Sequence, residues 1–132
     1  MSYLVDTHVF LWALGTPENL SKKTNNILLR SESAKYISPI TFWEIALKFS
    51  TGKLDLKGRL PDNMPGMAKE LGFEILNLDT NVVATFYKLP KLKNKDPFDR
   101  MLAWQAISGD FSLLTKDKSF ADYKNYGLKT IW

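Results

Sequence analysis

The stretch SYLVDTHVFLWAL, residues 2–14, decides the fold class of this chain. Its first part is a short apolar run that ends on Asp6, which predicts a buried strand over residues 2–6. Its second part, residues 8–14, is apolar at almost every position and is followed by a glycine and then a proline, which predicts a helix that stops there. A strand that passes directly into a helix is typical of a βαβ unit, in which the next strand runs parallel to the first.

The remainder of the chain repeats this alternation of strands and helices. Further strands are predicted at residues 34–39, 73–78, 112–117 and 128–132, and helices at residues 20–30, 41–54, 60–72, 79–89 and 97–108. Such alternation predicts an α/β fold whose parallel sheet, of four to five strands, is covered by helices on both faces. The chain has 132 residues and contains no internal repeat and no linker-like segment, so residues 1–132 are expected to form a single domain.

The composition excludes several classes of protein. Hydrophobic residues make up 45% of the chain and aromatic residues 13%, so a buried core is expected and disorder is not. Cysteine is absent, which excludes disulfides, thiolate metal sites and cysteine nucleophiles. No apolar run approaches the roughly 18 residues of a membrane-spanning helix, and none suits a signal peptide. We therefore expect a soluble, cytoplasmic protein that does not associate with membranes.

Two aspartates stand three residues apart in KDPFDRMLAWQAI, residues 95–107. Asp96 suits the N-cap of the predicted helix, and Pro97 suits its first position, where the missing N–H costs nothing. Asp99 lies in the first turn, where the helix dipole favours a negative charge. These local roles explain both aspartates without any chemistry, so a functional interpretation needs support from the rest of the chain.

Asp6 and Asp117 provide part of that support, because each comes at the end of a predicted strand. In open α/β sheets, ligands bind beyond the carboxyl ends of the strands. Taken alone, each aspartate also fits a turn or a helix cap.

Glu44 lies inside a strongly apolar helical segment, between Trp43 and Ile45. A charge at such a position is avoided unless it is paired or bound to a metal. The alternative is that Glu44 reaches solvent along a narrow polar stripe with Lys48, its i+4 neighbour.

Together these acids predict a metal centre at one edge of the sheet, because converging carboxylates repel one another unless cations lie between them. Oxygen ligands, the absence of cysteine and a single histidine favour Mg²⁺ or Mn²⁺ over Zn²⁺. Carboxylate-held metal ions are suited to the cleavage of phosphodiester bonds. The net charge of +4 and pI near 9.2 are compatible with an anionic substrate, although a lysine-rich loop before residue 96 also fits a merely solvated loop.

Four ordered segments resemble the successive motifs of the PIN domain, and more narrowly the VapC-like ribonuclease toxins of type II toxin–antitoxin systems. They are YLVDTHVFLWAL, SPITFWEIALKFSTGKL, DPFDRMLAWQAI and LLTKDKSF, and the resemblance runs essentially from end to end. It implies a three-layer α/β/α fold and Mg²⁺-dependent cleavage of RNA. It also implies a cognate VapB-like antitoxin and a homodimer.

The resemblance assigns roles to individual residues. The catalytic and metal-binding acids are Asp6, Glu44, Asp99 and Asp117. Thr7 and Thr115 match the hydroxyl positions that support the site, and Asp96 is a further supporting candidate. Apart from the resemblance, position and charge make His8, Lys93, Lys95, Arg100 and Lys116 candidate contacts to the substrate, although His8 also fits a packing or capping role. Close relatives often carry a histidine shortly before the DPFDR segment, whereas this chain has lysines and an asparagine there. The resemblance therefore leaves the substrate preference open.

Two other functions remain compatible with the same motifs. The chain fits a PIN nuclease that processes RNA outside any toxin system, or a PIN module that binds RNA or protein without cutting. A non-catalytic module usually lacks one or more of the acids, and here all of them are present. A receiver-like phosphoacceptor domain is disfavoured, because it normally needs a pair of acids after the first strand and Asp6 stands alone there.

Overall fold

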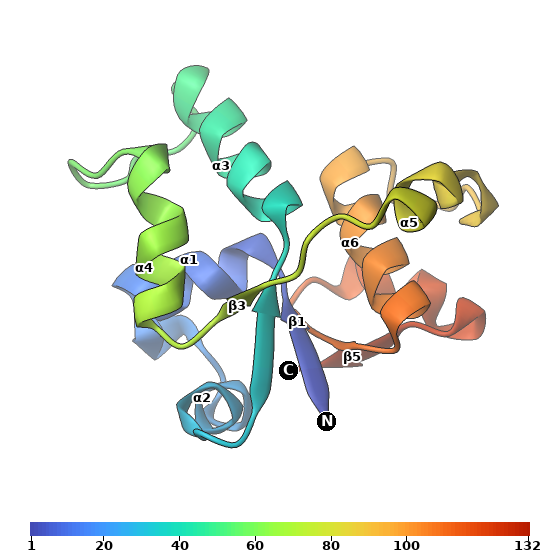
Figure 1. Ribbon diagram of the computed structural model, residues 1–132, viewed down its shortest axis with the longest axis horizontal. Coiled ribbons are helices and arrows are strands. Elements are labelled where there is room, and N and C mark those ends of the chain that lie inside the picture. Colours follow the sequence, from blue (N-terminus) through green and yellow to red (C-terminus); the bar gives the residue numbers. More distant parts are fainter.

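The computed structural model describes residues 1–132 and contains one parallel sheet of five strands. The strands are β1 (Ser2–Val5), β2 (Ala34–Ile37), β3 (Glu74–Ile75), β4 (Ser112–Leu114) and β5 (Lys129–Ile131). Their order across the sheet is β3-β2-β1-β4-β5, so the first strand lies at the centre (Figure 1). The parallel sheet predicted from the alternation of elements is confirmed.

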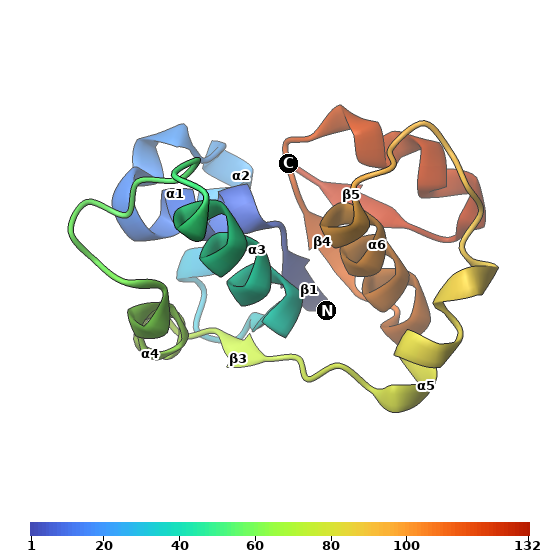
Figure 2. The same ribbon diagram turned by 90° about the horizontal axis from the view of Figure 1, so that it is seen from above.

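Helices cover both faces of this sheet, which gives three layers. They are α1 (Thr7–Gly15), α2 (Lys22–Leu29), α3 (Pro39–Ser50), α4 (Met64–Glu70), α5 (Thr80–Ala84) and α6 (Pro97–Gly109), with short 3₁₀ segments η1 (Pro17–Asn19), η2 (Pro61–Asn63), η3 (Phe86–Lys88) and η4 (Lys118–Tyr126). Figure 2 shows α1, α2 and α4 on one side and α5 and α6 on the other, and Figure 1 shows α3 beyond the end of β2. Each helix falls short of the length and apolar character that crossing a membrane requires.

The central strand explains why both faces of the sheet are buried. Side chains alternate along a strand, so Tyr3 and Val5 join one apolar cluster with Phe10 of α1, while Leu4 joins a second cluster with Leu102 of α6. A strand buried on both faces reads as a continuous apolar run, and this is how the run at residues 2–5 appears in the sequence.

Several boundaries differ from the predicted ones for local reasons. Helix α3 begins two residues earlier than predicted, because the side chain of Ser38 accepts the N–H of Ile40 at 3.1 Å and Pro39 occupies the first position. The helix predicted at residues 79–89 is divided into α5 and η3. No element was predicted at residues 118–126, which form η4 and end at Gly127 with a φ of 99°. A 3₁₀ segment of this kind lacks the 3.6-residue apolar period that reveals a helix.

The register of the sheet brings two of the predicted site residues together. Val5 of β1 pairs with Leu114 of β4. The residues that follow, Asp6 and Thr115, therefore leave the sheet side by side at its carboxyl edge. Helices α3 and α6 reach the same edge (Figures 1 and 2).

Candidate functional site

Asp6 lies at the carboxyl end of the central strand, where hydrogen bonds hold both its backbone and its side chain. It is 4% exposed, and its N–H donates to the carbonyl of Leu114 at 3.0 Å. The hydroxyl of Thr115 donates to Asp6 Oδ2 at 2.8 Å. Burial raises the pKa of Asp6 above its ordinary value, although the hydrogen bond from Thr115 and the nearby His8 act to lower it. The end of the central strand thus holds a buried carboxyl group at a defined position.

Glu44 is also buried, at 3% exposure, and both of its oxygens are occupied. The hydroxyl of Thr7, the first residue of α1, donates to Glu44 Oε1 at 2.7 Å. The ammonium of Lys48 forms an ion pair with Glu44 Oε2. The pairing that the i+4 spacing suggested is therefore present, and the carboxylate is buried among apolar neighbours only because these partners satisfy it.

The two aspartates of the DPFD segment do different things. Asp96 caps α6, since its Oδ1 accepts the N–H groups of Phe98 at 2.8 Å and Asp99 at 3.0 Å. The carboxyl of Asp99 instead accepts a hydrogen bond from the side chain of Asn94. The pKa of Asp99 is raised from 3.8 to about 7, chiefly by burial and in smaller part by the charges of Asp96, Asp6 and Glu44, while the hydrogen bond from Asn94 acts to lower it.

These charges show that Asp6, Glu44 and Asp99 lie in one electrostatic field although they come from three separate segments. The charge of Glu44 contributes to the raised pKa of both Asp6 and Asp99, and a cation among these carboxyls would offset that repulsion. Asp96 adds to it from the helix N-terminus.

Asn94 is a site residue that the sequence did not single out. Its amide nitrogen donates to Asp99 Oδ2 at 3.1 Å and to Ser119 Oγ at 2.9 Å. Its oxygen accepts the N–H of Asp96 at 2.9 Å. Asparagine commonly bonds the backbone two residues ahead in a turn, and this spacing before the helix cap was the available signal. Asn94 ties the lysine-rich loop to α6 and to η4.

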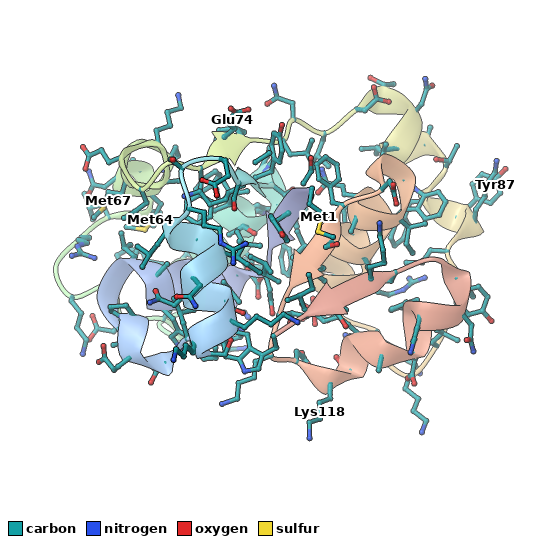
Figure 3. The ribbon with its side chains drawn as sticks, turned by 90° about the horizontal axis from the view of Figure 1, so that it is seen from below. Met1, Met64, Met67, Glu74, Tyr87 and Lys118 are labelled. Carbon is teal, nitrogen blue, oxygen red and sulfur yellow. The ribbon has the colours of Figure 1, made fainter.

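Asp117 makes its hydrogen bonds with Thr115 and Ser119 and with none of the other acids. It is exposed, its Oδ1 accepts the N–H of Ser119 at 2.9 Å, and its own N–H donates to Thr115 Oγ1 at 3.0 Å. It therefore caps η4, whose first residue, Lys118, projects away from the molecule (Figure 3). No three of the chain's histidine, aspartate and glutamate side chains lie close enough together to hold a metal ion as a group, so metal binding by these acids stays a prediction.

Two of the predicted substrate contacts flank Trp12. His8 is exposed, and its ring centroid lies 5.9 Å from that of Trp12. The ammonium of Lys116 lies 5.9 Å from the centroid of the same ring. Trp12 also packs against Trp132, with centroids 5.8 Å apart. These residues form an aromatic and basic rim next to Asp6.

The other predicted contacts lie on the loop before α6. Lys93 and Lys95 are exposed, and Lys95 lines a cavity of about 320 Å³ with Lys91 and Asn94. The cavity also borders Arg100.

The guanidinium of Arg100 is occupied by the protein itself. It donates to the carbonyl of Leu89 at 3.2 Å and to the hydroxyl of Tyr123 at 3.4 Å, and it stacks over the ring of Phe86 at 4.8 Å. Arg100 therefore anchors the segment that leads into the lysine-rich loop.

Comparison with known proteins agrees with this fold. The family model of the PIN domain matches residues 3–126. The chain therefore belongs to the PIN domain family. Among curated proteins, no sequence matches it.

Three solved structures have a similar fold. One is VapBC2 from Rickettsia felis bound to a DNA fragment from their promoter, with 20% identity, a TM-score of 0.71 and coverage of 100% of this chain and 99% of that one. DNA-bound VapBC from Salmonella typhimurium has 16% identity, a TM-score of 0.67 and coverage of 99% and 97%. FitAcB from Neisseria gonorrhoeae has 21% identity, a TM-score of 0.67 and coverage of 98% and 96%.

Proposed function

We propose that this chain is a divalent-metal-dependent endoribonuclease and the toxin of a VapBC-type toxin–antitoxin system. Membership of the PIN family and the similarity of fold to VapBC and FitAcB chains support the proposal. The observation that carries it is the common field of Asp6, Glu44 and Asp99 at the carboxyl edge of the sheet. This edge is where open α/β sheets bind their ligands.

The donor set fits Mg²⁺ or Mn²⁺. Asp6, Glu44, Asp99 and Asp117 offer only carboxylate oxygens, which hard divalent cations prefer. Burial and, in smaller part, the charges of Asp96, Asp6 and Glu44 raise the pKa of Asp99, so a bound cation would favour its ionised form. When bound, the metal would lower the pKa of the attacking water and stabilise the leaving oxygen of the phosphodiester.

The remaining predicted residues would position the acids and the RNA. Thr115 and Thr7 hold Asp6 and Glu44 through the hydrogen bonds described above, and Asp96 fixes the first turn of α6 that carries Asp99. Contacts to the phosphate backbone would come from exposed basic side chains on the rim around Trp12 and on the lysine-rich loop. These side chains are His8, Lys93, Lys95 and Lys116, with Arg100 supporting the loop.

The proposed partners are a VapB-like antitoxin and a second copy of the chain. Helix α3 exposes Trp43 and Leu47, which are 61% and 44% accessible. Exposed apolar side chains of this size, one helical turn apart, suit a protein interface. An antitoxin segment that reached the acids would present arginine or lysine to them.

The test is cleavage of RNA by the purified chain. We expect cleavage with Mg²⁺ or Mn²⁺ and its loss with a chelator, and we expect Mn²⁺ to raise the melting temperature because a ligand of the native state adds stability. Asp6→Asn should be inactive, whereas Asp62→Asn, at an exposed position away from the site, should match the wild type. Cleavage that persists in chelator contradicts the proposal.

A further inference from the structure

Helices α3 and α6 are in contact, and Figure 1 shows both at the carboxyl end of the strands. Trp43 of α3 packs edge-on against Phe98 of α6, with ring centroids 5.2 Å apart. One turn beyond Glu44, α3 carries Lys48, whose side chain is 38% exposed while that of its partner Glu44 is 4% exposed. Lys48 therefore bridges the buried acid and the open surface.

The charges of carboxylates from both helices act on the ammonium of Lys48. Burial alone lowers the pKa of Lys48, but the hydrogen bond and charge of Glu44 and the charges of Asp96 and Asp99 outweigh it, so the pKa is raised. Two of these carboxylates, Glu44 and Asp99, belong to the proposed metal centre, and Asp96 caps the helix that carries Asp99. Lys48 thus supplies the positive charge that this cluster requires.

We propose that Lys48 is the internal counterion of the acidic centre, and that a divalent cation must displace it from Glu44. This inference rests on the proposed function for the identity of the cation. Both oxygens of Glu44 are taken, Oε1 by Thr7 and Oε2 by Lys48. The half-exposed ammonium on its flexible stem is the partner that can turn out into solvent, because the hydroxyl of Thr7 is buried.

The consequence is a competition between Lys48 and the metal. Without metal, Lys48 reduces the repulsion among the carboxylates and keeps Glu44 paired at its buried position. With metal, the ion pair is lost and the ammonium becomes free at the rim of the site. Lys48 is thus a positioning residue that stabilises the metal-free protein and weakens metal binding.

The experiment compares Mn²⁺ binding by calorimetry and metal-free melting for the wild type, Lys48→Met and Lys53→Met. Lys53→Met is the matched control, since it removes the same charge from an exposed position without a carboxylate partner. We expect Lys48→Met to bind Mn²⁺ roughly fivefold more tightly, equivalent to about 1 kcal/mol, and to melt lower than the control without metal. Lys48→Arg, which keeps the charge, should restore wild-type melting.

A second variant and a double mutant complete the test. Lys48→Gln should share the gain in Mn²⁺ affinity, which keeps the test open if Lys48→Met folds poorly. In a Glu44→Gln background, Lys48→Met should change metal-free stability less than in the wild type, because the pair is already broken. Unchanged or weaker Mn²⁺ binding by both Lys48 variants overturns this inference alone. A wild-type chain that binds no Mn²⁺ overturns the proposed function together with it.

Discussion

Asp99→Asn tests whether the first turn of α6 serves chemistry or only begins a helix. The substitution keeps the shape of the side chain, and its amide oxygen can still accept the hydrogen bond from Asn94. It removes one negative charge from the field of Asp6, Glu44 and Asp96. We expect it to abolish RNA cleavage and to stabilise the metal-free protein.

The magnitude follows from the pKa of Asp99, which rises from 3.8 to about 7 in the folded protein. At roughly 1.4 kcal/mol per pH unit, ionising this carboxyl costs about 4 kcal/mol at most. The side chain is only partly buried, so solvent screening reduces this cost to about 1–2 kcal/mol. Losing a first-turn aspartate costs about 0.3–1 kcal/mol. The net gain of about 1 kcal/mol corresponds to a rise in melting temperature of about 2–6 °C.

The stability difference between the wild type and Asp99→Asn should depend on pH. The folded protein holds the proton of Asp99 up to about pH 7, whereas the unfolded chain releases it near pH 3.8. The wild type therefore loses stability as the pH rises between these values. The advantage of Asp99→Asn should be complete above about pH 7 and should fade as the pH falls towards about 4.

The assay is thermal melting in chelator across this pH range, with RNA cleavage measured in parallel. Asp96→Asn is the matched control, because asparagine caps a helix about as well as aspartate, and it should keep measurable activity. If Asp99→Asn cleaves RNA like the wild type, or melts lower than it at about pH 8, the aspartate only begins the helix and our reasoning is refuted.

Three further predictions concern the support of the site and its biological effect. Thr115→Val should destabilise the protein by about 1–3 kcal/mol in urea unfolding, because the buried Asp6 loses its donor; an unchanged midpoint would show that this bond contributes nothing. Asn94→Ala should slow RNA cleavage about tenfold or more, since it releases Asp99 and the loop together, and wild-type rates would exclude a positioning role. Expression of the chain alone should arrest bacterial growth, and Asp99→Asn should relieve the arrest; growth unaffected by the active chain would favour a role in RNA processing.

Local chemistry made much of the fold predictable from the sequence. Asp96 caps its helix as the sequence predicts, and Ser21 and Asp79, which are also residue types favoured at N-caps, accept backbone N–H groups at the starts of α2 and α5. The alternation of apolar runs and helical patterns was sufficient for the parallel sheet, because a strand buried on both faces must be apolar throughout. Asp6 at the end of the first strand and Asp99 in the first turn of a helix were likewise expected at one edge of that sheet.

What only the tertiary structure decided depends on contacts between distant segments. The order of the strands sets Asp6 beside Thr115, a pair separated by 109 positions. The same packing buries Lys35 of β2, whose ammonium donates to the carbonyl of Leu28 at the end of α2 at 2.6 Å; no local pattern distinguishes it from a surface lysine. The different environments of the acids also come from the tertiary structure. Burial and the charges of neighbouring acids raise the pKa of Asp99, whereas Asp117 is exposed and caps η4. Residue types and spacing determine which groups can reach a site, but the field at each group depends on which neighbours the completed fold brings to it.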